Sequence, residues 1–442
     1  MSSRRDDASP TFPFDPERFD PAYLVTLDEL YHSGWAARKK RRIAFMREAV
    51  AHFWPKGHPT RLIHITGTNG KGSVAHYLCG GLRFAGGTGS WTGPHVFDYA
   101  ERFHLDGEKV GHDEIVTVYR KIIEPYQQAF MARHPGESLT FAEQGILLAL
   151  HLFQRHAVVW GVMEVGAGGR YTPLMALDVH ACVLTNVAED HPKTLGEHGW
   201  QRALEKAGIA RHGRPFFTAA EGVNRPFVEK TAQAEGAEVI GVADGDPDAI
   251  QAVLPRREPG FKLRNLALAC KVIRHFYPGL SLEVLTENMV HHLPARFWRL
   301  APNVVADVAH NADKIAKLAE QLRLAYPSES LRLIVGLTRN RDARAVFRPL
   351  LRIADHVVVT SASYVGQSPR DIAEALRPEH DRIEVVDDPA EAYRRERTRL
   401  ADGEVLVLTG SAYMIDQALN ENPFLRHVNA SFGWRNAPSD MN

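Results

Sequence analysis

This sequence of 442 residues has few cysteines, no net charge and no long apolar run. Its three cysteines are far apart and form no CxxC pair, which disfavours a disulfide framework or a structural zinc site and fits a reducing cytosol. Lys+Arg and Asp+Glu both number 53, so no net field draws the molecule to nucleic acid or to an anionic membrane. No apolar run reaches the ~18 residues that a membrane span needs. We therefore expect a cytoplasmic protein that contacts neither membrane nor nucleic acid.

The amino-terminal stretch, residues 1–22, also lacks an apolar segment. It carries an arginine pair followed by acidic residues and prolines, and we expect a flexible tail rather than a secretory or twin-arginine signal. The remaining length exceeds one ordinary core, so two domains are expected.

The first part of the chain alternates between strand and helix patterns. Apolar strands are predicted at Leu62–Thr66, Val158–Val165 and His180–Val187, and helices at Ser73–Phe84 and Thr140–Gln154. Continuous apolar strands that alternate with helices indicate a parallel sheet covered on both faces. We assign residues 23–294 to this domain.

A second set of alternating elements indicates a smaller, doubly wound α/β domain over residues 295–442. Its strands are predicted at Val304–Val308, Leu331–Gly336, His356–Thr360, Arg382–Val386 and Glu404–Leu408. Its helices are predicted at Asp313–Ala325, Ala343–Ala354, Pro369–Leu376 and Ala390–Leu400. The first of these strands lacks a following GxGxxG, which argues against a dinucleotide site.

The stretch "RLIHITGTNGKGS" (61–73) joins a strand, a glycine-rich turn and a helix start. Unsatisfied backbone N–H groups and the positive end of the helix dipole favour an anion at such a turn. The glycines permit close backbone approach, Lys71 can reach outer phosphates and Ser73 can ligate Mg²⁺. The stretch departs from GxxxxGK[ST] at Ile65 and Gly72. The alternative is a tight turn with a solvated lysine.

Two more polar positions follow the next predicted strands. Glu164 lies in "MEVGAGGR", and Asp190 and His191 lie in "TNVAEDHPKTLG". The carboxyl ends of parallel strands form the edge where α/β sheets bind ligands, and Mg²⁺ bound to phosphates takes one or two protein oxygens. The alternatives are a satisfied carboxylate at a strand end and an ordinary surface histidine.

Ten motifs follow one another along residues ~40–420: "HITGTNGKGSVAHYL", "GPHVFDYAERFHLDG", "TFAEQGILLALHLF", "MEVGAGGR", "TNVAEDHPKTLG", "EKAGIA", "LRNLALA", "PARFWRL", "DVAHNADKIAKLAEQL" and "LVLTGSAYMI". In this order and rough spacing they resemble the folylpolyglutamate synthase and dihydrofolate synthase family of the Mur ligase superfamily. That family's own phosphate loop is GTNGKGS, which accounts for both departures.

The resemblance implies an ATP-dependent ligase that activates an acceptor carboxylate as an acyl phosphate and couples it to the amino group of L-glutamate. It implies two Mg²⁺ sites, with K⁺ as a further candidate cation, and metal ligands at Ser73, Glu164 and His191. Lys206 matches a lysine that the family carbamylates. The implied ATP-binding residues are Gly67, Thr68, Asn69, Gly70, Lys71, Gly72, Ser73, Asn265, Arg296 and Asp307.

The resemblance further implies that Arg296 reaches the γ-phosphate, Asn265 contacts adenine and Asp307 binds ribose. His310 and Ser411 would help to place the nucleotide or the incoming amino acid. The implied catalytic residues are Lys71, Lys206, Arg296 and His310. Those implied on the acceptor side are Pro94, His95, Arg102, Tyr171 and Ser411.

Two departures from the family concern the acceptor. Gly93 stands where the family's TSPH motif has a serine that ligates the second metal, and "GGRYTPLM" (168–175) replaces GGRLDATN. Loss of the polar groups suggests a more apolar acceptor wall at Tyr171, Pro173 and Leu174. Three hypotheses follow: glutamate ligation to a folate-like acceptor, ligation to another small carboxylic acid, and a non-catalytic ATP-binding protein. A monomer is expected.

Overall fold

The computed structural model describes residues 20–33, 40–189, 192–289 and 296–420. The amino-terminal domain contains an eight-stranded sheet in the order β4-β3-β2-β5-β1-β6-β7-β8. The strands β2, β5, β1, β6, β7 and β8 are parallel to their neighbours in this series, and the β2-β3 and β3-β4 pairs at one edge are antiparallel. The strands are β1 (Arg61–Thr66), β2 (Thr88–Trp91), β3 (Phe103–Leu105), β4 (Glu108–Lys109), β5 (Trp160–Glu164), β6 (Ala181–Leu184), β7 (Pro215–Thr218) and β8 (Glu238–Gly241).

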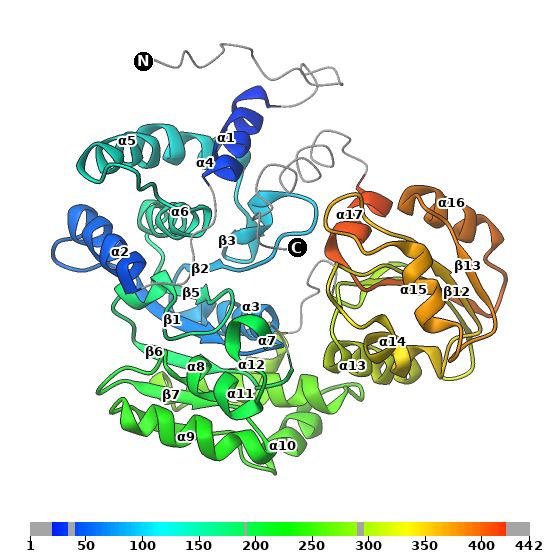
Figure 1. The fold of residues 1–442 in the computed structure, drawn as a ribbon. Helices are drawn as coiled ribbons and strands as arrows, with labels where there is room; N and C mark the ends of the chain where they lie inside the picture. The colour runs from blue at the N-terminus through cyan, green and yellow to red at the C-terminus, as the bar shows by residue number, and fades with distance from the viewer. Residues whose placement is uncertain (1–19, 34–39, 190–191, 290–295, 421–442) are drawn as a thin grey trace, which may run out of the picture.

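Helices cover both faces of this sheet (Figure 1). One face packs against α3 (Lys71–Leu82), α10 (Asp246–Val253), α11 (Gly260–Phe276) and α12 (Leu282–Met289). The other packs against α1 (Pro21–His32), α2 (Lys40–Phe53), α4 (His112–Val118), α5 (Glu124–Arg133), α6 (Phe141–Arg155), α8 (Gly199–Ala207) and α9 (Arg225–Ala234). The short α7 (Pro192–Leu195) precedes α8. In β1, Leu62 belongs to one core and Ile63 and Ile65 to the other, because side chains alternate along a strand.

The carboxyl-terminal domain lies beside the first (Figure 1) and contains a six-stranded sheet in the order β13-β12-β11-β14-β10-β9. Its strands are β9 (Trp298–Ala301), β10 (Val304–Asp307), β11 (Ser330–Val335), β12 (His356–Val359), β13 (Ile383–Val385) and β14 (Glu404–Thr409). One face packs against α13 (Ala312–Ala325), α14 (Ala343–Leu351) and α15 (Pro369–Leu376), the other against α16 (Pro389–Arg399) and α17 (Ala412–Leu419).

The predicted two-domain α/β architecture is confirmed, and every strand and helix predicted from the sequence is present with bounds shifted by a few residues. The structure adds the strands β2, β3, β4, β7, β8 and β9, of which β9 pairs antiparallel with β10. Most of the predicted tail and the predicted boundary at 294 lie outside the described residues.

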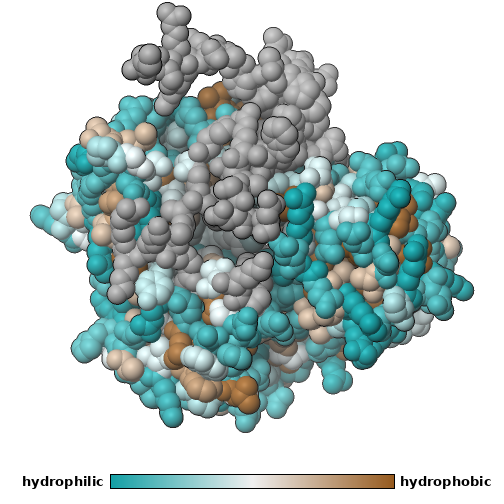
Figure 2. Space-filling model, viewed as in Figure 1, coloured by the Kyte–Doolittle hydropathy of each residue, from teal (hydrophilic) through white to brown (hydrophobic). Residues whose placement is uncertain are grey.

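The visible surface is largely hydrophilic, with small apolar areas scattered over it (Figure 2). Among the helices that the structure describes, none combines the length and apolar character that a membrane crossing requires.

Candidate active site

The glycine-rich turn after β1 is shaped by its glycines. Gly67 and Gly70 have φ of +140° and +83°, in the region that favours glycine. A Cβ on Gly67 would collide with Thr185 Oγ1, which donates a hydrogen bond to Asn69 O at 2.6 Å. The turn is therefore pinned against the end of β6, and α3 begins at Lys71 as the phosphate-loop prediction requires.

Two lysines converge on the first carbonyl of this turn. Lys71 Nζ and Lys206 Nζ each donate to Gly67 O, at 3.1 Å and 3.0 Å. Lys206 is buried, with an exposed fraction of 2%. Lys71 Nζ also lies 3.7 Å from Glu164 Oε1. Positive charge concentrated beside a helix amino terminus favours a polyanion such as a nucleotide phosphate.

Glu164 ends β5 beside the turn, where the sequence placed it. Its Oε2 accepts a hydrogen bond from the N–H of Gly93 at 3.1 Å, and it borders a small cavity of about 70 Å³ together with Gly72, Thr92 and Arg296. A carboxylate in a polar cavity that adjoins the phosphate loop fits a hard cation with oxygen ligands. The predicted metal ligand His191 lies outside the described residues, as does Asp190.

A larger cavity of about 520 Å³ opens between the two domains, within the size range of small-molecule sites. The predicted ATP-binding residues that line it are Asn69, Gly70, Ser73, Asn265, Arg296 and Asp307. The amide of Asn265, on α11, lies directly over the turn, since a Cβ on Gly70 would be 2.8 Å from its Nδ2. Arg296 borders both cavities, so they adjoin at this residue.

Asn69 connects the phosphate loop to the carboxyl-terminal domain. Its side-chain amide donates to Asp313 Oδ2, and its backbone N–H donates to Asn186 Oδ1 at 2.9 Å. The first turn of α13 therefore contacts the phosphate loop directly.

Asp307 ends β10 on the far wall of the large cavity. Its carboxylate accepts the backbone N–H groups of Phe297 at 2.7 Å and Ala309 at 2.8 Å. Burial raises the pKa of Asp307, while Arg296 and these hydrogen bonds act in the opposite direction.

His310 and Ser411, both predicted to help place a substrate, have different hydrogen-bond partners. His310 is hydrogen-bonded to Val308 O at 2.8 Å and to Lys314 Nζ at 3.1 Å. Ser411 is buried and caps α17, where its Oγ accepts from the N–H of Met414. Ser411 does not line either of the two cavities, so its role in placing a substrate stays a prediction.

The acceptor-side residues form a connected group next to Gly93. Arg102 Nε donates to His95 Nδ1 at 2.9 Å, and His95 Nε2 lies 3.1 Å from the hydroxyl of Tyr31. A Cβ on Gly93 would lie 2.7 Å from Arg102 Nη1. The guanidinium therefore occupies space that a side chain at position 93 would need, which links the glycine to Arg102.

Part of the segment 171–175, which the sequence predicts to line the acceptor site, is buried in the protein core instead. Leu174 is fully buried in the core beneath the sheet, and Met175 packs against that core, where its sulfur accepts from Arg211. Leu174 therefore does not face an acceptor. Tyr171 and Pro94 remain candidates, and only Pro94 borders the small cavity.

Two residues without a predicted role also belong to the site. Lys314 lines the large cavity, and its position in the first turn of the predicted helix, four residues after His310, could have indicated it. Tyr31, on α1, carries no sequence signal, because its contact with His95 joins residues 64 apart.

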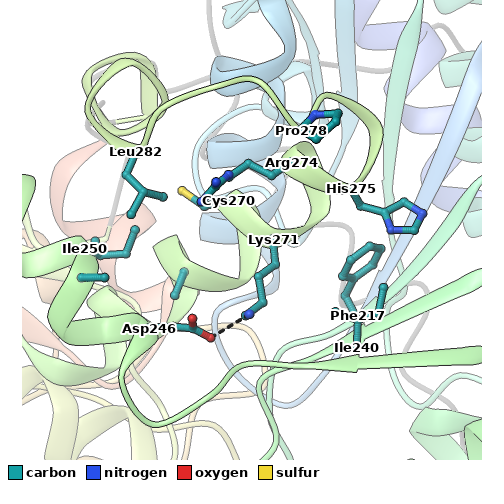
Figure 3. Close-up of a pocket in the computed structure, with 12 residues that line it drawn as sticks. Phe217, Ile240, Asp246, Ile250, Cys270, Lys271, Arg274, His275, Pro278 and Leu282 are labelled. Atoms are coloured by element: carbon teal, nitrogen blue, oxygen red, sulfur yellow. Dashed lines mark ion pairs between the residues drawn. The ribbon is translucent and has the colours of Figure 1, made fainter.

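A further cavity of about 450 Å³ lies apart from this site, between α10, α11, β7 and β8 (Figure 3). Phe217 and Ile240 lie on its apolar side, and Lys271 and Asp246 form an ion pair at 2.9 Å between the two helices. Its lining contains none of the predicted site residues.

One group of possible metal-ligating side chains among the described residues, His356, Glu384 and Glu396, lies on the carboxyl-terminal domain. Arg332 and Arg395 pair with these carboxylates at 2.6 Å and 2.8 Å, so their charge is already balanced.

Comparisons with known proteins agree with this geometry. Residues 296–412 match the family described as Mur ligase, glutamate ligase domain. A probable bifunctional folylpolyglutamate synthase/dihydropteroate synthase of Haloferax volcanii is 28% identical over 84% of the chain; the chain spans 47% of that relative's length. A dihydrofolate synthase/folylpolyglutamate synthase of Bacillus subtilis is 25% identical, and the match covers 81% of this chain and 90% of that protein's length.

The structure of Mycobacterium tuberculosis folylpolyglutamate synthase complexed with ADP has the same fold, with a TM-score of 0.79 at 22% identity over 93% of this chain and 98% of that one. The chain thus has the fold of that synthase, and its carboxyl-terminal domain matches the glutamate ligase domain of Mur ligases. Within that fold, the curated relatives it resembles over most of its length are folylpolyglutamate and dihydrofolate synthases.

Proposed function

We propose that the protein is an ATP-dependent ligase that joins the carboxylate of a folate or folate-like acceptor to the amino group of L-glutamate. The observation that carries this proposal is that the glycine-rich turn, Glu164 and Arg296 line two adjoining cavities, the larger of which has a volume of about 520 Å³, enough for a nucleotide. The match of residues 296–412 to a glutamate ligase domain supports ligation, and the names of the relatives favour folate over another acid.

In the first step, an oxygen of the acceptor carboxylate attacks the γ-phosphorus of ATP, the bond to the bridging oxygen breaks, and ADP leaves. The amino nitrogen of glutamate then attacks the acyl carbon, phosphate leaves, and the nitrogen loses a proton. Phosphoryl transfer of this kind depends mainly on positioning and charge neutralisation. Lys71 and Arg296 supply positive charge on opposite sides of the γ-phosphate position in this proposal.

Ser73 and Glu164 offer the oxygen ligands that would hold Mg²⁺, with His191 as a further ligand outside the described residues. The metal would neutralise phosphate charge. Asn265 orients the adenine and Asp307 the ribose in the large cavity. Carbamylation of Lys206 is part of the proposal, and K⁺ is a further candidate cation.

The test is a ligation assay. Purified protein, Mg-ATP and L-glutamate are incubated with dihydropteroate, tetrahydrofolate and simple aromatic or pterin acids, and phosphate release and product mass are measured. A glutamyl product with a pterin acceptor is expected. Turnover with a non-pterin acid alone would move the acceptor to another class, and nucleotide binding without turnover on every acceptor would contradict ligation.

A further inference from the structure

The far wall of the nucleotide cavity carries a lysine that the family motifs do not assign. Lys314 lies in the first turn of α13 and lines the 520 Å³ cavity, whose opposite side is formed by Gly70 and Ser73 of the phosphate loop. Arg296 borders the same cavity. Cationic side chains thus approach the cavity from the carboxyl-terminal domain as well as from the loop.

The position of Lys314 is unfavourable for the isolated helix. The amino-terminal end of a helix carries partial positive charge and favours acidic side chains, as Asp313 illustrates in the same turn. Lys317, one turn later, is paired with Asp313 at 2.7 Å. A lysine kept in the first turn beside a cavity is explained if an anion approaches that end of α13.

His310 fixes where the ammonium of Lys314 lies. Val308 O can only accept a hydrogen bond, so Nδ1 of His310 carries the proton and donates to it at 2.8 Å. Nε2 therefore has a free lone pair, which accepts a proton of the Lys314 ammonium at 3.1 Å.

The imidazole in this arrangement is neutral. Burial lowers the pKa of His310, and the nearby charges of Lys314 and Arg341 lower it further. Arg341 is held in place because its Nη1 donates to His310 O at 3.0 Å. A neutral acceptor orients Lys314 without itself balancing its charge. The acidic group Asp307 lines the same cavity, and the charge of Lys314 acts to lower the pKa of Asp307. Both ring nitrogens of His310 are already engaged.

We propose that Lys314 binds a phosphate group of the nucleotide and that His310 is a positioning residue that holds Lys314 in place. The inference rests on the proposed function only in that the large cavity takes ATP. It replaces direct substrate contact by His310 with an indirect role through Lys314.

Binding of a series of nucleotides tests the lysine without depending on ligation. Calorimetry measures the affinity of the full chain for adenosine, AMP, ADP and AMPPNP with Mg²⁺, for the wild type, Lys314→Ala, Lys314→Arg and Lys230→Ala. Lys230 is exposed on α9 and does not line the cavity, so it controls for the loss of one positive charge.

Lys314→Ala is expected to weaken binding of the phosphorylated members by about tenfold to a hundredfold, the effect of a hydrogen bond to a charged group, and to leave adenosine unchanged. Lys314→Arg should recover most of the affinity. Equal weakening of all four ligands, adenosine included, or no weakening at all, overturns the proposal. If the wild type itself binds no nucleotide, the proposed ATP-dependent function fails. If the wild type binds but Lys314→Ala binds equally well, only the role of Lys314 fails.

A double-mutant cycle tests the role of His310. His310→Ala is expected to weaken the same ligands as Lys314→Ala, and the double variant should be no weaker than Lys314→Ala alone. His310→Gln, which keeps a side-chain acceptor, should restore part of the affinity. Additive losses would show that His310 acts separately from Lys314 and would overturn the positioning role.

Discussion

Replacement of Gly93 by serine restores the residue type expected from the family motif, and we expect it to impair this protein. The backbone N–H of Gly93 donates to Glu164 Oε2 at 3.1 Å, which holds the residue in place. A Cβ there would be 2.7 Å from Arg102 Nη1, closer than real Cβ atoms approach any neighbour. Arg102 has a flexible side chain, so the guanidinium, rather than the backbone, must move.

The expected loss of affinity for the acceptor is calculated from the contacts that Arg102 would lose when its guanidinium moves. Its Nε donates to His95 Nδ1 at 2.9 Å, and the guanidinium lies 5.1 Å from the ring centre of Phe141. A hydrogen bond from a charged group contributes about 1.5–3 kcal/mol, and a cation–π contact adds about 0.5–1 kcal/mol. Recovered hydration offsets part of this, so we expect about 1.5–3 kcal/mol, which corresponds to about tenfold to 150-fold in affinity.

The assay is steady-state ligation with phosphate release as the readout. If Arg102 contacts the acceptor, Gly93→Ser should raise the KM for the acceptor as Arg102→Ala does, with the KM for ATP unchanged. The double variant should be no worse than Arg102→Ala. Gly279→Ser is the matched control, since a Cβ there meets nothing within 4 Å. A Gly93→Ser enzyme with the wild-type acceptor KM, or additive losses, would refute the reasoning.

Three further outcomes concern the phosphate loop and the carboxyl-terminal domain. Lys71→Ala should lower kcat at least ~100-fold with the melting temperature little changed; a loss of a few-fold contradicts its role. Glu396→Ala, which removes a fully buried partner of Arg332 at 2.6 Å, should cost about 3–5 kcal/mol in denaturant unfolding. Glu404→Ala, with a 3.3 Å contact to Arg332 and 24% exposure, should cost less than about 1 kcal/mol.

The same carboxylate predicts a pH dependence. Burial raises the pKa of Glu396, but the hydrogen bond and charge of Arg332 outweigh burial and lower it below its usual 4.5. The folded state therefore binds a proton less readily than the unfolded chain. The stability from this group is complete above pH 4.5 and is lost as the pH falls below it, and a Glu396→Gln variant should lack this part of the loss.

The central elements were predictable because their signals are local. β1, the turn and α3 combine an apolar strand, glycines and a helix start within thirteen consecutive positions (61–73), and the structure places them as expected. β2 and β9 were missed, since "TGSW" and "WRLA" are four-residue strands without strong apolar alternation. Their pairing depends on neighbours far along the chain.

The sequence by itself determined the fold class, the strand ends that carry Glu164 and Asp307, and the glycine-rich turn between β1 and α3, because backbone propensity, apolar period and glycine placement are properties of short segments. Tertiary structure alone decided that Arg102 occupies the space beside Gly93, that Leu174 is buried in the core, and that Lys314 lines the cavity between the domains. Contacts of this kind depend on which side chains meet after the sheets and helices have packed, and no local pattern encodes that meeting.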